Sequence, residues 1–184
     1  EFNRGLLDAV QGLIPICKPQ IAFYEEYGVE GIRAYIETIR YAHRKGLLVI
    51  SDAKRGDIGT TAEAYARAHL GSPVGLQGGF DADAVTVNPY LGAETIKPYV
   101  DVGLTRGKGI FVLVKTSNPG SGDIQDVTLN NAERTGEDTV FGLIARMVNK
   151  LGEDCIGACG YGAIGAVVGA TYPAQLKSLR ETMP

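Results

Sequence analysis

Residues 47–54 read LLVISDAK, and this stretch decides the fold. Its first half is a continuous apolar run, which is typical of a strand buried on both faces of a parallel sheet. Its second half carries Asp52 and Lys54, two residues apart. Because strand side chains alternate with a period of two, we expect both to point to the same side of the sheet. The stretch therefore predicts a buried strand whose C-terminal end carries opposite charges.

The same succession of apolar runs and helical periodicity recurs along the chain. Ile32, Ile36 and Ile39, for example, follow one another at spacings of four and three, which predicts the buried stripe of a helix. We expect strands to begin near residues 14, 47, 84, 110 and 164. We expect helices over 5–14, 29–45, 62–70, 93–102, 135–151 and 173–182, and loops over 72–79 and 118–132. Regular alternation of strands and helices predicts a parallel α/β sheet covered by helices.

Polar side chains follow each of the five expected strands. They lie at Lys18, at Asp52 and Lys54, at Asn88, over 115–117 and over 169–171. A doubly wound sheet usually binds its ligand at one switch point, whereas a (β/α)₈ barrel uses a ring of strand ends, so the pattern favours the barrel. A barrel needs eight strands in about 250 residues. We therefore expect residues 1–184 to form a single barrel domain that is incomplete at both ends, with about three strands lying outside it.

Composition narrows the class of protein. The 184 residues are 45% hydrophobic and 21% charged with a net charge of −3, which is typical of a soluble globular protein. No run approaches the roughly 20 apolar residues of a membrane span, and the net charge gives no general attraction to nucleic acid. Without a leader pattern, we expect a cytoplasmic protein. The three cysteines form neither a disulfide framework nor a metal site, and the two histidines lie far apart.

The sharpest chemical feature is a group of charges around residues 52–57. Asp52 and Lys54 share one side of their strand, Asp57 follows in the next loop, and Lys18 ends the neighbouring strand. A lysine between carboxylates is expected to keep its proton, so it can stabilise developing negative charge on carbon and then protonate it. The competing interpretation is a salt-bridge network that closes the barrel mouth. Spacing alone leaves both open.

Several weaker patterns complete the sequence, and some of them allow two interpretations. Thr60 to Glu63 fits a capping box at the start of a helix. Asn88 either touches a ligand or belongs to a turn stiffened by proline, and Lys115 either extends the charged group or forms a separate salt bridge. Residues 117–123 are either a lid or a solvated loop. The Gly160–Gly165 match to G-x-G-x-x-G precedes a strand, so it is not a dinucleotide site.

Residues 52–61, which read DAKRGDIGTT, carry a family resemblance. They resemble the D-x-K-x-x-D-I-G-x-T signature of orotidine 5'-phosphate decarboxylases, more narrowly that family's second bacterial type. Segments 18–23, 86–92, 111–119 and 165–171 resemble the same family in the same order. The resemblance implies a (β/α)₈ barrel, a homodimer and a carboxy-lyase without cofactor or metal. It would convert orotidine 5'-phosphate to UMP and CO₂, the last step of de novo pyrimidine synthesis.

The resemblance also implies roles for individual residues. Lys54 matches the lysine that protonates C6, Asp52 the aspartate beside the substrate carboxylate, and Lys18 the lysine that holds that aspartate and the ribose. Asp57 matches an aspartate that acts across the dimer interface. Ile58 and Thr61 match residues that the same partner loop contributes, and Ser117 matches the residue that contacts the pyrimidine ring. We also count Asn88 among the candidate substrate-binding residues.

Three family features have no counterpart in the sequence. These are an aspartate on the first strand, the phosphate-binding turn after the seventh strand and the arginine after the eighth. Two other functions therefore stay open. One is a metal-dependent sugar-phosphate decarboxylase or epimerase with a D-x-K strand on the same barrel, and the other is a non-catalytic binding module.

Overall fold

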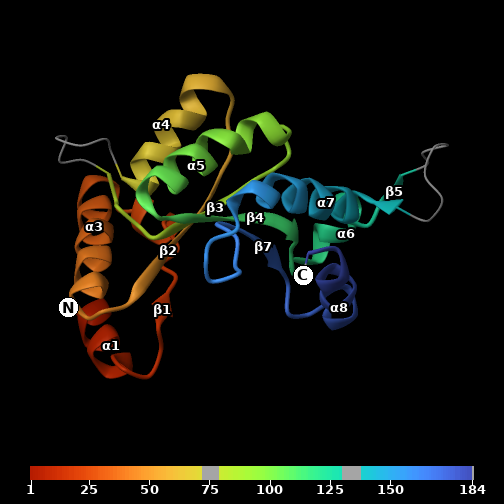
Figure 1. The fold of residues 1–184 in the computed structure, drawn as a ribbon. Helices are drawn as coiled ribbons and strands as arrows, with labels where there is room; N and C mark the ends of the chain where they lie inside the picture. The colour runs from red at the N-terminus through yellow and green to blue at the C-terminus, as the bar shows by residue number, and fades with distance from the viewer. Residues whose placement is uncertain (72–78, 130–137, 184) are drawn as a thin grey trace.

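A five-stranded parallel sheet organises the chain, as a computed structural model of residues 1–71, 79–129 and 138–183 shows (Figure 1). Its strands lie in the order β1-β2-β3-β4-β7. Strands that are neighbours in the sheet therefore also follow one another along the chain. A doubly wound sheet would reverse direction at a switch point. The sequential order is that of a barrel wall, as predicted. The strands are β1 (Ile16–Cys17), β2 (Leu48–Arg55), β3 (Ala84–Val87), β4 (Gly109–Lys115) and β7 (Ile164–Val168).

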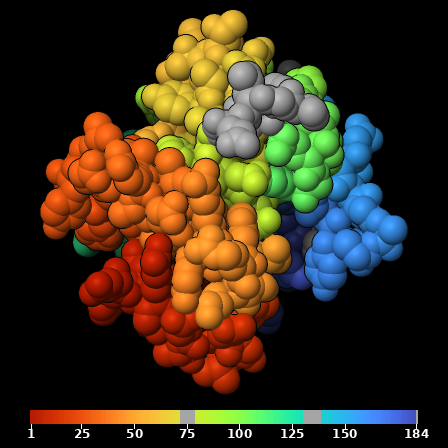
Figure 2. Space-filling view, turned by 90° about the vertical axis from the view of Figure 1, so that its left-hand side faces the viewer, coloured from red at the N-terminus to blue at the C-terminus, as the bar shows by residue number. Residues whose placement is uncertain are grey.

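Helices follow one another along the outer face of this sheet (Figure 1). The long ones are α1 (Phe2–Val10), α3 (Gly28–Arg44), α4 (Gly59–Leu70), α5 (Ala93–Arg106), α7 (Val140–Gly152) and α8 (Pro173–Thr182). Shorter elements are α2 (Ala22–Glu25), η1 (Pro119–Ser121), α6 (Gly122–Gln125), η2 (Glu153–Cys155), and the antiparallel pair β5 (Thr128–Leu129) and β6 (Asp138–Thr139). Seen from the side in Figure 2, the colours run around the face from red through gold and green to blue, as sequential strand order requires.

The core lies between the sheet and this helical layer. In β4 the residues Ile110, Val112 and Val114 are buried, whereas Phe111 and Leu113 between them are only partly covered. The apolar runs predicted strands buried on both faces. Among the described strands only β3 is buried at every position, and Leu48 of β2 is half exposed. The face of the sheet that points away from the helices is thus the more open one, because the described strands do not close into a complete barrel around it.

The predicted element boundaries are wrong in several places. The first strand was expected to begin near residue 14 but begins at Ile16 and contains only Ile16 and Cys17. Residues 118–129 hold η1, α6 and β5 in place of a plain loop. The helix expected from residue 135 begins at Val140, where the Thr139 hydroxyl accepts a hydrogen bond from the amide of Gly142 at 3.2 Å. Residues 72–78, 130–132 and 135–137 of the predictions lie outside the described residues.

The capping box is also absent. The chain enters α4 at Gly59, with Ile58 as the extended residue before it and no side-chain cap. Thr60 therefore lies inside the first turn, where its hydroxyl cannot serve as the N-cap. Glu63 instead pairs with Arg67 one turn later, with 3.3 Å between carboxylate oxygen and guanidinium nitrogen. In the part of the chain that the structure describes, no helix is long and apolar enough to cross a membrane.

Candidate active site

Asp52 sits between two ammonium groups at the C-terminal end of β2. The Lys18 Nζ donates to one carboxylate oxygen at 2.5 Å, and the Lys54 Nζ donates to the other at 2.5 Å. Only 7% of the Asp52 side chain is exposed, whereas both lysines reach solvent. The three residues that the sequence placed together at two neighbouring strand ends are therefore in contact. We call Lys18, Asp52 and Lys54 the charged cluster.

The electrostatics of the charged cluster keep the aspartate ionised. Burial by itself would raise the pKa of Asp52, but the hydrogen bonds and charges of Lys18 and Lys54 outweigh it, so the pKa lies below its ordinary value. Two ammonium groups against one carboxylate leave the cluster with a net positive charge. An anionic ligand placed beside the charged cluster would be attracted by the two lysines and repelled by the carboxylate of Asp52.

Thr86 of β3 holds the backbone that carries this cluster. Its hydroxyl oxygen accepts hydrogen bonds from the amides of Ala53 and Lys54, both at 2.9 Å, and donates to Asp52 at 3.0 Å. Lys54 has a φ of +50°, in the left-handed region that a side chain rarely adopts, and the pairing of β2 with β3 slips at this point. The hydroxyl thus satisfies two amides that the bulge removes from the sheet.

Sequence reasoning missed this role of Thr86. The only available signal was a hydroxyl residue within the otherwise apolar strand at residues 84–87. A buried hydroxyl requires a partner, but the register slip that supplies its three partners cannot be read from periodicity.

Asp57, Ile58 and Thr61 lie apart from the charged cluster. The Asp57 carboxylate accepts from the amide of Ile58 at 2.8 Å and forms no ion pair with any residue that the structure describes. Of the four charged residues that the sequence groups around 52–57, only Lys18, Asp52 and Lys54 therefore meet within one chain. Ile58 and Thr61 are exposed at the start of α4. Gly56 fixes the course of this loop, because an added Cβ would lie 2.8 Å from the carbonyl oxygen of Asn88.

Asn88 directly follows β3, and Ser117 lies two residues after the end of β4, so both lie at the C-terminal edge of the parallel sheet. The Asn88 side-chain oxygen accepts a hydrogen bond from the amide of Tyr90 at 3.0 Å. This side chain therefore stabilises a turn, which is one of the two roles that the sequence allowed for it. Ser117 is exposed and packs so closely on Gly169, after β7, that a Cβ there would come within 2.9 Å of the Ser117 Cβ.

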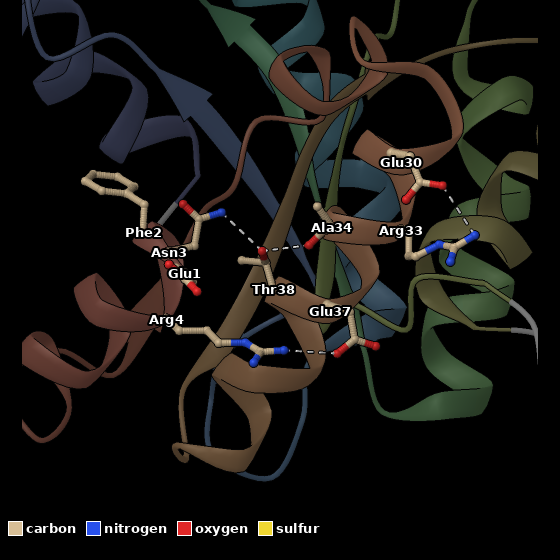
Figure 3. Close-up of a pocket in the computed structure, with 9 residues that line it drawn as sticks. All are labelled: Glu1, Phe2, Asn3, Arg4, Glu30, Arg33, Ala34, Glu37 and Thr38. Atoms are coloured by element: carbon tan, nitrogen blue, oxygen red, sulfur yellow. Dashed lines mark hydrogen bonds and ion pairs between the residues drawn. The ribbon is translucent and has the colours of Figure 1, made fainter.

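A separate hollow lies between α1 and α3, and its lining includes none of the charged cluster (Figure 3). Four of its charged side chains form ion pairs, Arg4 with Glu37 and Arg33 with Glu30. Within residues 1–71, 79–129 and 138–183, no group of three or more His, Cys, Asp or Glu residues is arranged to hold a metal ion.

Comparison with known proteins adds to this geometry. The family model described as "Orotidine 5'-phosphate decarboxylase / HUMPS family" matches residues 4–183. The chain belongs to this family. It is 48% identical over 184 residues to the orotidine 5'-phosphate decarboxylase of Rhodopirellula baltica, covering 100% of this chain and 59% of that protein. It is 41% identical over 181 residues to that of Clostridium novyi, covering 98% and 59%.

Solved structures support the same family assignment. The OMP decarboxylase of Leishmania donovani superposes with a TM-score of 0.79 at 32% identity, over 98% of this chain and 62% of that one. The predicted family and the α/β barrel fold are therefore confirmed. The chain spans about 59% of the length of the curated relatives it matches.

Proposed function

We propose that this chain supplies the charged half of the active site of an orotidine 5'-phosphate decarboxylase. The enzyme would convert orotidine 5'-phosphate to UMP and CO₂ in the last step of de novo pyrimidine synthesis. The observation that carries the proposal is Asp52 held at 2.5 Å by both Lys18 and Lys54, in a member of this family. The curated relatives from Rhodopirellula baltica and Clostridium novyi described above are named for this activity.

The charged cluster suits the reaction step by step. The bond between C6 and the carboxylate carbon breaks, CO₂ leaves, and the electron pair stays on C6. The Lys54 ammonium stabilises that charge and then gives its proton to C6, and solvent returns a proton to the lysine. The ionised Asp52 lies where the substrate carboxylate would be crowded, and Lys18 keeps Asp52 in place. Neither step calls for a cofactor or a metal.

Part of the site would come from a second copy of the chain. Asp57 lacks an ion-pair partner among the described residues of its own chain, and the charged cluster carries an excess positive charge. In a homodimer, Asp57 of the partner subunit would offset that charge, with Ile58 and Thr61 of the same loop contacting the ligand. The exposed apolar surface of Ile58 is consistent with burial in such an interface.

The remaining contacts follow the order of the strand ends. Ser117 would contact the pyrimidine ring, and Asn88 would shape the adjoining turn. Strands that complete the barrel and the phosphate site would come from residues outside 1–184. We place the enzyme in the cytoplasm, where its three free thiols stay reduced.

A decarboxylation assay tests the proposed function. The full-length protein that carries this chain is incubated with orotidine 5'-phosphate, and CO₂ release is followed with and without a chelator. We expect equal rates in both. Loss of activity on chelation would favour a metal-dependent sugar-phosphate enzyme, and tight binding of UMP without CO₂ release would favour a non-catalytic module.

A further inference from the structure

Lys115 is a fully buried charge that the proposed reaction does not use. It ends β4, two residues before Ser117, and its side chain has no exposed surface. Its Nζ pairs with the Asp126 carboxylate at 2.8 Å and donates to the Ser121 hydroxyl at 3.2 Å. A buried ammonium is costly unless it is paired and hydrogen-bonded. The pairing of Lys115 with residues on a separate segment is thus a strong constraint on that segment.

Lys115 also joins elements that are distant in sequence. The Tyr172 ring, just after β7, faces its Nζ with 4.7 Å to the ring centroid, and Phe141 in the first turn of α7 lies 6.0 Å away. Aromatic faces attract a desolvated cation. The carbonyl of Lys115 accepts a hydrogen bond from the Gly169 amide at 2.7 Å. One residue therefore connects β4, the end of β7, α7 and the segment from 118 to 126.

A second set of contacts closes the same segment. The Thr116 amide donates to the Gln125 side chain at 2.9 Å, and Gln125 donates back to the Thr116 hydroxyl at 2.8 Å. The Thr116 hydroxyl in turn donates to Asn118 at 2.7 Å. Ser117 lies between these anchored neighbours, with Gly169 against its Cβ. Its position is therefore fixed from both sides of the chain.

We propose that Lys115 and Asp126 form a latch that holds residues 116–126 on the end of β4 and so positions Ser117 toward the ligand. Lys115 is a positioning residue in this scheme, because it acts through Ser117 and does not touch the ligand. The assignment of Ser117 to the ligand rests on the proposed function, whereas the latch itself does not.

The test uses Lys115→Met in the full-length protein. Methionine keeps most of the volume among the aromatic rings, and replacing a buried ion pair by an apolar side chain is often neutral for stability. The second variant is Asp126→Asn, at a half-exposed position. It is used for the test if Lys115→Met does not fold. The matched control is Lys97→Met, which breaks an exposed ion pair with Asp101 on α5.

The first readout is amide hydrogen exchange of Thr116 and Ser121, which is independent of the ligand. We expect exchange to accelerate at least about tenfold in either latch variant and to stay unchanged in the control. Unchanged exchange in the latch variants would overturn the latch, whether or not the protein decarboxylates anything.

The second readout is the affinity for UMP in a double-mutant cycle with Ser117→Ala. If Lys115 acts through Ser117, each single variant weakens binding about three- to tenfold and the double variant is no weaker than either one. Independent, multiplying losses would show that Lys115 does not act through Ser117. A wild-type protein that neither binds UMP nor releases CO₂ would refute the proposed function, and the exchange result would still decide the latch.

Discussion

Replacing Thr86 by valine should weaken both the fold and the charged cluster. Valine has the shape of threonine but lacks the hydroxyl, so the amides of Ala53 and Lys54 lose their acceptor and Asp52 loses a donor. A buried polar group left without a partner costs about 1–3 kcal/mol. Since Thr86 is 3% exposed, water cannot replace its hydroxyl without rearrangement. We expect a loss of about 2–4 kcal/mol in the free energy of unfolding.

The effect on catalysis should exceed that of an ordinary buried threonine. The left-handed backbone at Lys54 would relax once its amide is free, and a displacement of about 1 Å in a reacting group can cost about 100-fold in rate. Loss of the hydrogen bond to Asp52 should also raise the pKa of that carboxyl, so the acid limb of the pH–rate profile should move to higher pH.

The assay compares three variants by urea unfolding and by steady-state kinetics. Thr86→Ser keeps the hydroxyl and should retain the rate. Thr95→Val is the matched control, since Thr95 is equally buried but donates only to the carbonyl of Gly92. It should lose about 1 kcal/mol and keep its kcat. Equal kcat values for Thr86→Val and Thr95→Val would refute the claim that the hydroxyl positions the charged cluster.

Three further outcomes are expected. Mixing Lys54→Ala with Asp57→Ala chains, each inactive alone, should restore activity in hybrid dimers, and proven hybrids without activity would show that Asp57 serves its own chain. Burial lowers the pKa of His69 to about 4, against about 6.5 when unfolded. The contribution of His69 to the free energy of unfolding should therefore be complete above pH 6.5 and should fall by about 3 kcal/mol as the pH drops to 4. Urea unfolding of His69→Gln should show a flatter dependence of that free energy on pH. Gly56→Ala should lower the melting temperature because its Cβ would meet a backbone oxygen at 2.8 Å, whereas Gly152→Ala, with open space in α7, should not.

The sequence predicted the parts of the site that depend on periodicity. Apolar runs located the five strands, and two-residue alternation correctly brought Lys54 to Asp52. The contact nevertheless forms on an unexpected backbone, because Lys54 has a left-handed φ and the pairing of β2 with β3 shifts register there. Alternation cannot reveal such a bulge.

Features that depend on tertiary contacts could not be predicted. The capping box at Thr60 failed because the chain enters α4 two residues early, with Ile58 as the residue before the helix. Lys115 was open between two roles, and its burial depends on Asp126 and Tyr172, which come from other elements. Local patterns specify where strands end, and packing between elements decides which of the polar groups there meet.

The central claim is that Lys54 delivers the proton at the carbon that loses CO₂. Its most direct test is the rate of CO₂ release from orotidine 5'-phosphate by the full-length protein, its Lys54→Ala variant and a Lys97→Ala control. Lys54 is 43% exposed and lies outside the core, so circular dichroism should show a folded variant. The account predicts that Lys54→Ala lowers the rate of CO₂ release by about 100- to 10,000-fold and that the control leaves the rate unchanged. Near-normal CO₂ release by folded Lys54→Ala would contradict it.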